Sequence, residues 1–203
     1  MNTNFIHPTS IVEESVILGN GNYIGPFCYI TGDTIIGDNN RFEAYCTIGT
    51  PAEHRDYFYI TEGALSIGNN NIFREYSSIN IGSISRTVIG NNVTLLTGAH
   101  VSHDCILADK ITLSHNVALG GHSIVMEGVN LGIAAICHQY SVLGAYSMIG
   151  MGSVVTKSSN ITPGNIYIGS PAKYLKPNTI GLERNNIDST LLYELNNQYT
   201  KLK

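Results

Sequence analysis

Bulky apolar residues recur at every sixth position over most of the chain. Three series follow this step, over residues 6–48, 67–79 and 89–161. An amphipathic helix repeats at about 3.6 residues and a strand at about 2, so neither explains the interval. The pattern instead predicts short strands, each with one apolar side chain pointing inward and a corner every six residues.

Three such sides close a triangular coil of eighteen residues, and the three series together predict about eight coils. Each coil buries its apolar residues only against its neighbours, so the core is a stack of aliphatic ladders whose ends need capping. Small residues four places after the apolar step are expected to fill the space beside the corners: Cys28, Cys46, Ala99, Cys105, Ala135, Ser141, Ser147 and Ser153.

Two insertions interrupt the period. Residues 49–66 read GTPAEHRDYFYITEGALS, and GSISRT precedes Val88. The coils have no structural need for these polar segments, and loops on a rigid scaffold are where binding residues concentrate. We therefore expect them beside a functional site, with tolerated surface insertions as the alternative.

The period fades after Ile161, where prolines punctuate an extended segment. Four apolar residues near the end of the chain then follow helical spacing, and Asp188 or Ser189 is placed to cap that helix. These four residues are Leu191, Leu195, Tyr199 and Leu202. The expected organisation is a coil domain over residues 1–177 and a short helical tail over 178–203.

Composition removes several classes of function. The formal net charge is -4 and the basic residues form no run, which argues against nucleic acid as a partner. No stretch approaches the roughly 18 apolar residues of a membrane span, and the chain shows no leader segment. The four cysteines show no CxxC spacing. A cytoplasmic protein with free thiols is expected.

Histidines are the candidate chemical groups, and the segment GAHVSHDC contains two of them. His122 lies one coil plus one residue from His103, and His138 two coils less one, so all three should line one side of the prism. His100 joins them from the preceding corner, whereas His115 belongs to another side. Such a strip suits acid and base chemistry near neutral pH, and half-buried structural histidines are the alternative.

Several runs resemble one enzyme family. They are LLTGAHVSHDC, LGGHS, ICHQY, GLERNN and the opening HPTSIVEESVILGNGNYIGPFCYI. They are similar to the acyl carrier protein dependent UDP-N-acetylglucosamine acyltransferases that begin lipid A synthesis. The resemblance implies an all-β, left-handed parallel β-helix with projecting loops. It also implies a homotrimer and direct acyl transfer from thioester to nucleotide sugar without metal or permanent cofactor.

The resemblance also implies roles for individual residues. His103 would be the general base, and Asp104 would orient its imidazole if the corner turns both side chains outward. The backbone N–H of Gly121 would stabilise the oxyanion. Substrate contacts would come from four further residues, Asp56, His100, His122 and His138.

Donor contacts divide between two related families. Arg184 matches the first of an arginine pair in the lipid A enzymes, whereas Lys173 in IGSPAK resembles the basic residue of hexapeptide acetyltransferases that use acetyl-CoA. The donor is thus expected to be either an acyl carrier protein thioester or an acyl-CoA. An N-acetyltransferase of nucleotide amino sugars is the corresponding alternative function.

The chain departs from the lipid A enzymes where they carry basic or titratable groups, at Phe58, Asn80, Ile81 and Asn185. Two further alternatives come from other classes. A γ-class carbonic anhydrase would bind zinc through histidines, but its five-residue histidine step differs from HVSH. A purely structural β-helix would not need the two polar insertions.

Overall fold

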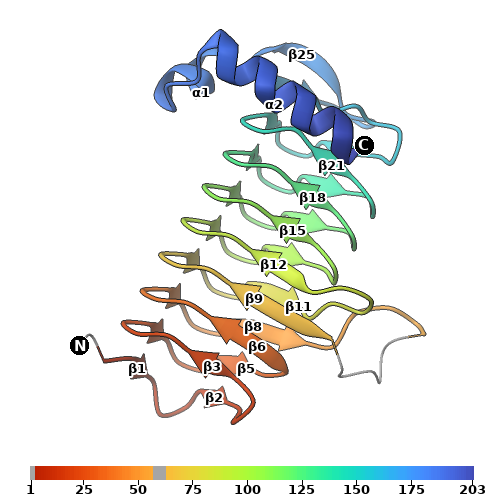
Figure 1. Ribbon diagram of the computed structural model, residues 1–203. Coiled ribbons are helices and arrows are strands. Elements are labelled where there is room, and N and C mark those ends of the chain that lie inside the picture. The colour runs from red at the N-terminus through yellow and green to blue at the C-terminus, as the bar shows by residue number, and fades with distance from the viewer. Residues whose placement is uncertain (1–2, 57–62) are drawn as a thin grey trace.

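A computed structural model describes residues 3–56 and 63–203. The chain winds into a β-solenoid of about nine turns that ends in helices. Figure 1 shows the coils stacked from the N-terminus to the C-terminal helices, with the two ends of the chain at opposite ends of the stack. Successive strands pass from sheet to sheet, and each pairs in parallel with the equivalent strand of the next coil, as predicted from the hexad period.

Three sheets form the sides of the prism. Sheet A contains β1 (Phe5–Ile6), β4 (Tyr23–Ile24), β7 (Arg41–Phe42), β10 (Ile72–Phe73), β13 (Thr94–Leu95), β16 (Thr112–Leu113), β19 (Asn130–Leu131), β22 (Met148–Ile149), β24 (Asn165–Ile168) and β25 (Lys173–Pro177). Sheet B contains β2 (Ile11–Val12), β5 (Tyr29–Ile30), β8 (Thr47–Thr50), β11 (Ser78–Asn80), β14 (His100–Val101), β17 (Ala118–Leu119), β20 (Ile136–Cys137) and β23 (Val154–Val155). Sheet C contains β3 (Ile17–Leu18), β6 (Asp33–Ile36), β9 (Ala64–Ile67), β12 (Thr87–Ile89), β15 (Ile106–Leu107), β18 (Ile124–Val125) and β21 (Val142–Leu143).

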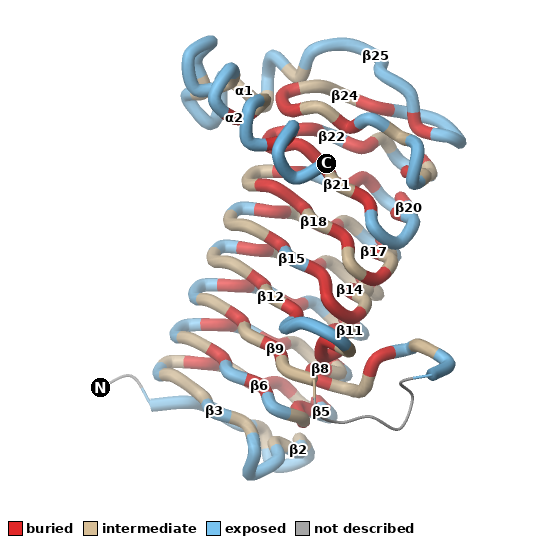
Figure 2. The backbone as a smooth tube through the Cα atoms, turned by 45° about the vertical axis from the view of Figure 1, so that its right-hand side comes forward, coloured by how far each residue is buried: buried red, intermediate tan, exposed pale blue. Residues whose placement is uncertain are grey.

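The core lies inside the prism, as Figure 2 shows by the inward red segments of successive coils. From Ile24 onward the residues on the hexad step are buried, and Leu95 and Val101 are fully so. The predicted small corner residues, from Cys28 to Ser153, are buried too, and all four cysteines are free thiols. The open N-terminal coil is the exception, since Ile6 stays 43% exposed.

The expectation of about eight coils was one short. The hexad step continues past Ile161 to Tyr167, which lies inward on β24 and is buried. β24 pairs in parallel with β22 and extends sheet A by one more coil, and antiparallel β25 closes that edge. An aromatic residue flanked by proline-rich segments hid this last step from the apolar pattern.

The corners depend on residues in the left-handed backbone region, which favours Gly, Asn and Asp. In the N-terminal half, buried asparagines stack at one corner, and each side chain bonds the backbone of the next coil. The Oδ1 of Asn22 accepts from the N–H of Asn40, that of Asn40 from Asn71, and that of Asn71 from Val93, at 2.7–3.0 Å. These bonds satisfy corner N–H groups that no strand partner reaches.

Two helices follow the last strand, α1 (Thr179–Arg184) and α2 (Ser189–Leu202). Asp188 caps α2 by accepting from the N–H of Leu191 at 2.8 Å, as the sequence predicted. Leu195 and Tyr199 pack against Met126 and Tyr146 of the last coils. The sequence did not predict α1. No described helix has the length and apolarity that a membrane crossing requires.

Candidate active site

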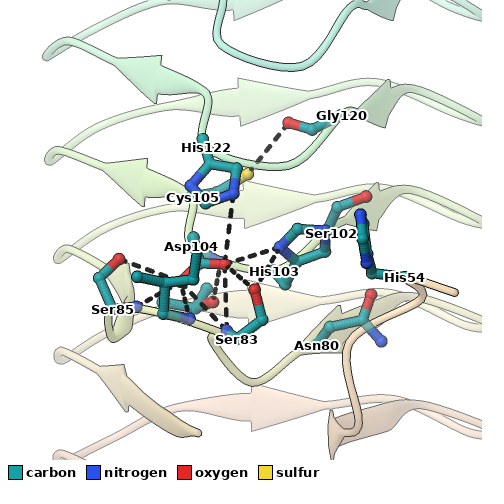
Figure 3. Close-up of polar contacts among 12 residues, drawn as sticks. His54, Asn80, Ser83, Ser85, Ser102, His103, Asp104, Cys105, Gly120 and His122 are labelled. Atoms are coloured by element: carbon teal, nitrogen blue, oxygen red, sulfur yellow. Dashed lines mark hydrogen bonds and ion pairs between the residues drawn. The ribbon is translucent and has the colours of Figure 1, made fainter. Parts of the chain in front are cut away.

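His103 and Asp104 form a hydrogen-bonded pair at the corner between β14 and β15. Asp104 has a φ of +59°, so the chain turns there, and two consecutive side chains reach each other, which a regular strand would prevent. The Nδ1 of His103 lies 2.7 Å from Asp104 Oδ2. The orienting role expected for Asp104 required a corner that brings its side chain and that of His103 together. The structure has such a corner, and Figure 3 shows the two side chains in contact.

The second insertion wraps around the Asp104 carboxylate. The backbone N–H groups of Ser83, Ile84 and Ser85 donate to it at 2.6–3.1 Å. The two serine hydroxyls add bonds of 2.6 Å and 3.0 Å. Figure 3 shows Ser85 and Ser83 around the Asp104 carboxylate, and the Ser83 hydroxyl also lies 3.3 Å from Nδ1 of His103. GSISRT thus forms an anion-binding cradle.

This cradle keeps Asp104 ionised. Burial raises the pKa of the carboxyl, since its side chain is 0% exposed. The hydrogen bonds from Ser83, His103, Ser85 and Ile84 act in the other direction and together hold the pKa well below its usual range. A carboxylate only accepts hydrogen bonds, so Nδ1 of His103 is its donor, and Nε2 is left with a free lone pair.

Gly121 packs against the face of the His103 ring. A Cβ at this glycine would lie 2.7 Å from Cε1 and 2.8 Å from Nε2 of the imidazole, too close for any side chain. The N–H of Gly121 donates to none of the described residues, although its carbonyl accepts from the N–H of Tyr140. Glycine here admits the ring, and Gly121 is buried beside it.

Two further imidazoles and a phenol ring extend the cluster. The rings of His54 and His122 meet that of His103 edge-on, with centroids 5.9 Å and 5.2 Å away. Tyr140 stacks on His122 at 4.5 Å. Burial lowers the pKa of His122, against the opposing effect of Asp104, so this ring is neutral at neutral pH.

His100 lies on β14, before the His103–Asp104 corner, and both of its ring nitrogens are hydrogen-bonded. Nδ1 lies 2.8 Å from the hydroxyl of Ser78 and Nε2 lies 3.0 Å from that of Ser102. Glu53, from the first insertion, approaches Nε2 at 3.7 Å. Burial lowers the pKa of His100 although Glu53 acts to raise it.

Of the other predicted site residues, only Asp56 contacts this cluster within the described part of the chain. His138 follows β20 on the same strip, but it is exposed and its Nδ1 faces the carbonyl of Gln139 at 2.9 Å. Asp56 is exposed on the first insertion, Lys173 on β25 and Arg184 at the end of α1. The backbone N–H of Asp56 donates to Nδ1 of His54 at 3.2 Å, whereas Lys173 and Arg184 make no bond to the histidines within the described residues. His115 lies at a different corner, as expected, and Phe58 falls outside the described residues.

Among the described residues, one group of side chains could hold a metal ion, because ligand atoms of His103, Asp104 and His122 lie within 4.8 Å of one another. The two oxygens of Asp104 are already surrounded by donors from Ser83 and Ser85. Those bonds fit an orienting carboxylate better than a metal ligand, which needs lone pairs free toward the ion.

Several residues of the site were not predicted. Ser83 and Ser85 lie in an insertion that was flagged only as a polar loop, and their contacts depend on how that loop folds back. His54 comes from the other insertion. Tyr140 had a usable signal: it lies eighteen residues from His122, at the equivalent corner of the next coil.

Comparison with known proteins gives consistent relatives. The model of the family described as bacterial transferase hexapeptide (six repeats) matches residues 15–50. The acyl-[acyl-carrier-protein]–UDP-N-acetylglucosamine O-acyltransferase of Alkalilimnicola ehrlichii is 33% identical over 138 residues, which is 66% of this chain and 53% of that protein. The enzyme of the same name from Sinorhizobium fredii is 33% identical over 141 residues, 68% of this chain and 52% of that protein. The chain thus spans about half the length of these relatives.

Solved structures agree with these sequences. The UDP-N-acetylglucosamine acyltransferase of Campylobacter jejuni superposes with a TM-score of 0.83 and 27% identity, covering 95% of this chain and 82% of that one. The enzyme of Francisella novicida superposes with a TM-score of 0.82 and 26% identity, covering 96% of this chain and 78% of that one. The chain therefore belongs to the hexapeptide-repeat, left-handed β-helix family of UDP-N-acetylglucosamine acyltransferase-like proteins.

Proposed function

We propose that this protein transfers an acyl group from the thioester of an acyl carrier protein to a hydroxyl of UDP-N-acetylglucosamine. The observation that carries the proposal is the His103–Asp104 pair, with its bond of 2.7 Å and its buried, ionised carboxylate. The names of the relatives support the choice of donor and acceptor. Their role in lipid A synthesis would then extend to this chain.

The pair supplies base catalysis. Asp104 holds the proton on Nδ1 of His103, so Nε2 takes the proton of the sugar hydroxyl as its oxygen attacks the thioester carbon. The C–O bond forms, the carbonyl becomes an oxyanion, and collapse of that intermediate breaks the C–S bond. The imidazolium returns its proton to the departing thiolate. Transfer is direct, without an acyl-enzyme.

Oxyanion stabilisation is assigned to the backbone N–H of Gly121. It is a buried donor beside the His103 ring with no described partner, so it is available to the developing charge. A single such donor contributes about 10²–10³-fold in rate in other acyl transfer enzymes. The neutral rings of His100 and His122 flank the base and bind substrate through hydrogen bonds.

We assign the remaining predicted contacts, Asp56, His138, Lys173 and Arg184, to substrate held against a second subunit. One chain supplies only one wall of the site, because His138 and Asp56 face outward from the prism. We therefore infer a homotrimer with sites between subunits, checked by light scattering of the purified protein. The free, buried thiols support a reducing compartment, and we place the reaction in the cytoplasm.

The test is a mass-spectrometric product assay with wild type and His103→Ala. One tube contains hydroxyacyl carrier protein and UDP-N-acetylglucosamine; others contain acetyl-CoA and nucleotide 3- or 4-amino sugars. We expect an ester in the first tube that the variant does not form. An amide from acetyl-CoA would instead support the N-acetyltransferase alternative suggested by Lys173. No product in any tube would reject His103 as the base for these substrates.

A further inference from the structure

A cavity lies beside the histidine cluster, on the N-terminal side of the catalytic corner. Its volume is about 480 Å³, and it is lined by Thr47, Thr50, Pro51, Glu53, Ser78 and Asn80. Ser78 and Glu53 are the same residues that contact His100. The cavity therefore lies next to the imidazole of His100.

Asn80 contributes the unusual feature of this cavity. The residue is 2% exposed, yet its side-chain oxygen Oδ1 has no hydrogen-bond partner within the described residues. A buried acceptor without a donor costs about 1–3 kcal/mol, so such groups are rare without a functional reason. In contrast, both polar atoms of the buried Asn71 are bonded to backbone of the next coil.

The orientation of the Asn80 amide is fixed by its other contacts. Nδ2 donates to the carbonyl of Pro51 at 3.0 Å and to the hydroxyl of Thr50 at 3.1 Å. A carbonyl can only accept, so the flipped amide would set two oxygens against each other. Oδ1 is therefore the acceptor left without a donor, in a residue that lines the cavity.

The position of Asn80 follows from the first insertion and the coil register. β11 pairs with β14 so that Ser78 faces His100, and continuing by one residue sets Asn80 beside Ser102, which precedes His103. The register against β8 shifts between Ile79 and Asn80, where the first insertion leaves the coil. Figure 3 shows Asn80 below the His103 ring, on the same side as His54.

The lining of this cavity accepts more hydrogen bonds than it can donate. Asn80 Oδ1 and the carboxylate of Glu53 only accept, the hydroxyls can do either, and no cationic side chain is among the lining residues. A phosphate would find no positive charge there. A ring that carries O–H and N–H groups would be complementary to it.

We propose that Asn80 is a specificity-determining residue that accepts a hydrogen bond from an O–H or N–H of the acceptor's sugar ring, and that its cavity holds this ring and not the diphosphate. The inference rests on the proposed function, in that the acceptor is a nucleotide sugar. It deepens that function, because it states which part of the acceptor lies on which side of the base.

The test measures binding by calorimetry without any donor, so it does not depend on turnover. The ligands are UDP, UDP-N-acetylglucosamine and three analogues of it: the 4-deoxy sugar, the 6-deoxy sugar and the ester in which oxygen replaces the acetamido N–H. Wild type should bind one analogue about tenfold to a hundredfold more weakly than the parent. Asn80→Leu should bind that analogue and the parent equally, and should bind UDP as wild type does.

Asn71→Leu serves as the matched control, since it also removes a buried asparagine. It should lower thermal stability while keeping the wild-type order of affinities. The inference fails if Asn80→Leu still discriminates between the analogue and the parent as wild type does. It also fails if the substitution weakens the binding of UDP as much as that of UDP-N-acetylglucosamine, or if wild type binds no sugar nucleotide. A wild type that discriminates between analogues but forms no ester in the product assay would reject the proposed reaction and leave the role of Asn80 standing.

Discussion

Two corners of the same column, two coils apart, differ sharply in what they do. Asp104 and Tyr140 both occupy the left-handed backbone position, with φ of +59° and +61°. The Asp104 side chain is 0% exposed and is enclosed by the Ser83–Ser85 segment, whereas Tyr140 is 52% exposed. His122 lies between them at the intermediate coil, in contact with both.

This difference indicates that the repeat fixes where a corner side chain lies, whereas the insertion provides the hydrogen-bond donors around it. The coil offers an outward-pointing side chain at the same place every eighteen residues, because the backbone turn recurs. At Asp104 a neighbouring loop adds three N–H groups and two hydroxyls, which the described contacts of Tyr140 do not include. Those donors hold a buried carboxylate ionised, 2.7 Å from Nδ1 of the His103 imidazole. The predictions that follow test this division of labour.

Removal of the base should have the largest effect. His103→Ala should lower kcat for acyl transfer by about 10²–10⁴-fold, since general base catalysis contributes that range. Steady-state product formation measures it. His115→Ala, at a corner without a catalytic partner, is the control and should retain wild-type activity. Equal losses in both variants would remove the distinction between the corners.

Asp104→Asn should follow, with kcat lowered by about 10²–10³-fold, because the amide cannot favour the Nδ1–H form of His103 as the carboxylate does. Its KM should change little if the acceptor does not touch Asp104. A loss confined to KM would contradict an orienting role.

Gly121→Ala should cost about 10²-fold in kcat, since a Cβ would displace the His103 ring and shift the oxyanion donor. Gly152→Asn is a suitable control: this corner glycine has a positive φ, of +64°, which asparagine tolerates, and a Cβ there meets nothing within 4 Å. Normal turnover by Gly121→Ala would mean that the ring does not react in the position observed.

Acid should weaken the catalytic corner selectively. Since the pKa of folded Asp104 is held below its ordinary value of about 4, its charge stabilises the fold fully above that pH and ceases to do so as pH falls through the lowered pKa. Asp104→Asn lacks this contribution. The Tm difference between wild type and variant should therefore be largest near pH 7 and shrink below about pH 4. A Tm difference that does not change with pH would contradict the stabilising role of the Asp104 charge.

Tyr140→Leu should have the smallest effect, a few-fold rise in KM, because aromatic stacking on His122 contributes about 0.5–1.5 kcal/mol. Tyr45→Leu is the matched control: Tyr45 stacks on Phe27 and Tyr76 at another corner, with centroids 5.1 Å apart. Identical kinetics of Tyr140→Leu and wild type would show that the second coil takes no part in binding.

The repeat made most of the fold predictable, and its interruptions explain what was missed. From residue 89 to 161 each step of six found a buried residue, because every coil meets the same neighbours. Tyr167 and α1 fell outside that regularity. In the site, the step of eighteen residues placed His103 and His122 on the same side of the prism. The left-handed turn at Asp104 was not predicted, and a turning corner was named only as the requirement for contact between Asp104 and His103. The cradle of Ser83 and Ser85 depends on the path of a loop that no period describes.

The tautomer of His103 tests the central claim most directly. The measurement is an NMR spectrum of protein with ¹⁵N-labelled histidine at alkaline pH, where imidazoles are neutral, with the His103 signals identified by their absence in His103→Gln. If the Ser83–Ser85 cradle holds Asp104 ionised, His103 should carry its proton on Nδ1 in wild type and lose that preference in Asp104→Asn. A proton on Nε2 in the wild-type protein would contradict the account, since the base would then have no free lone pair facing the substrate.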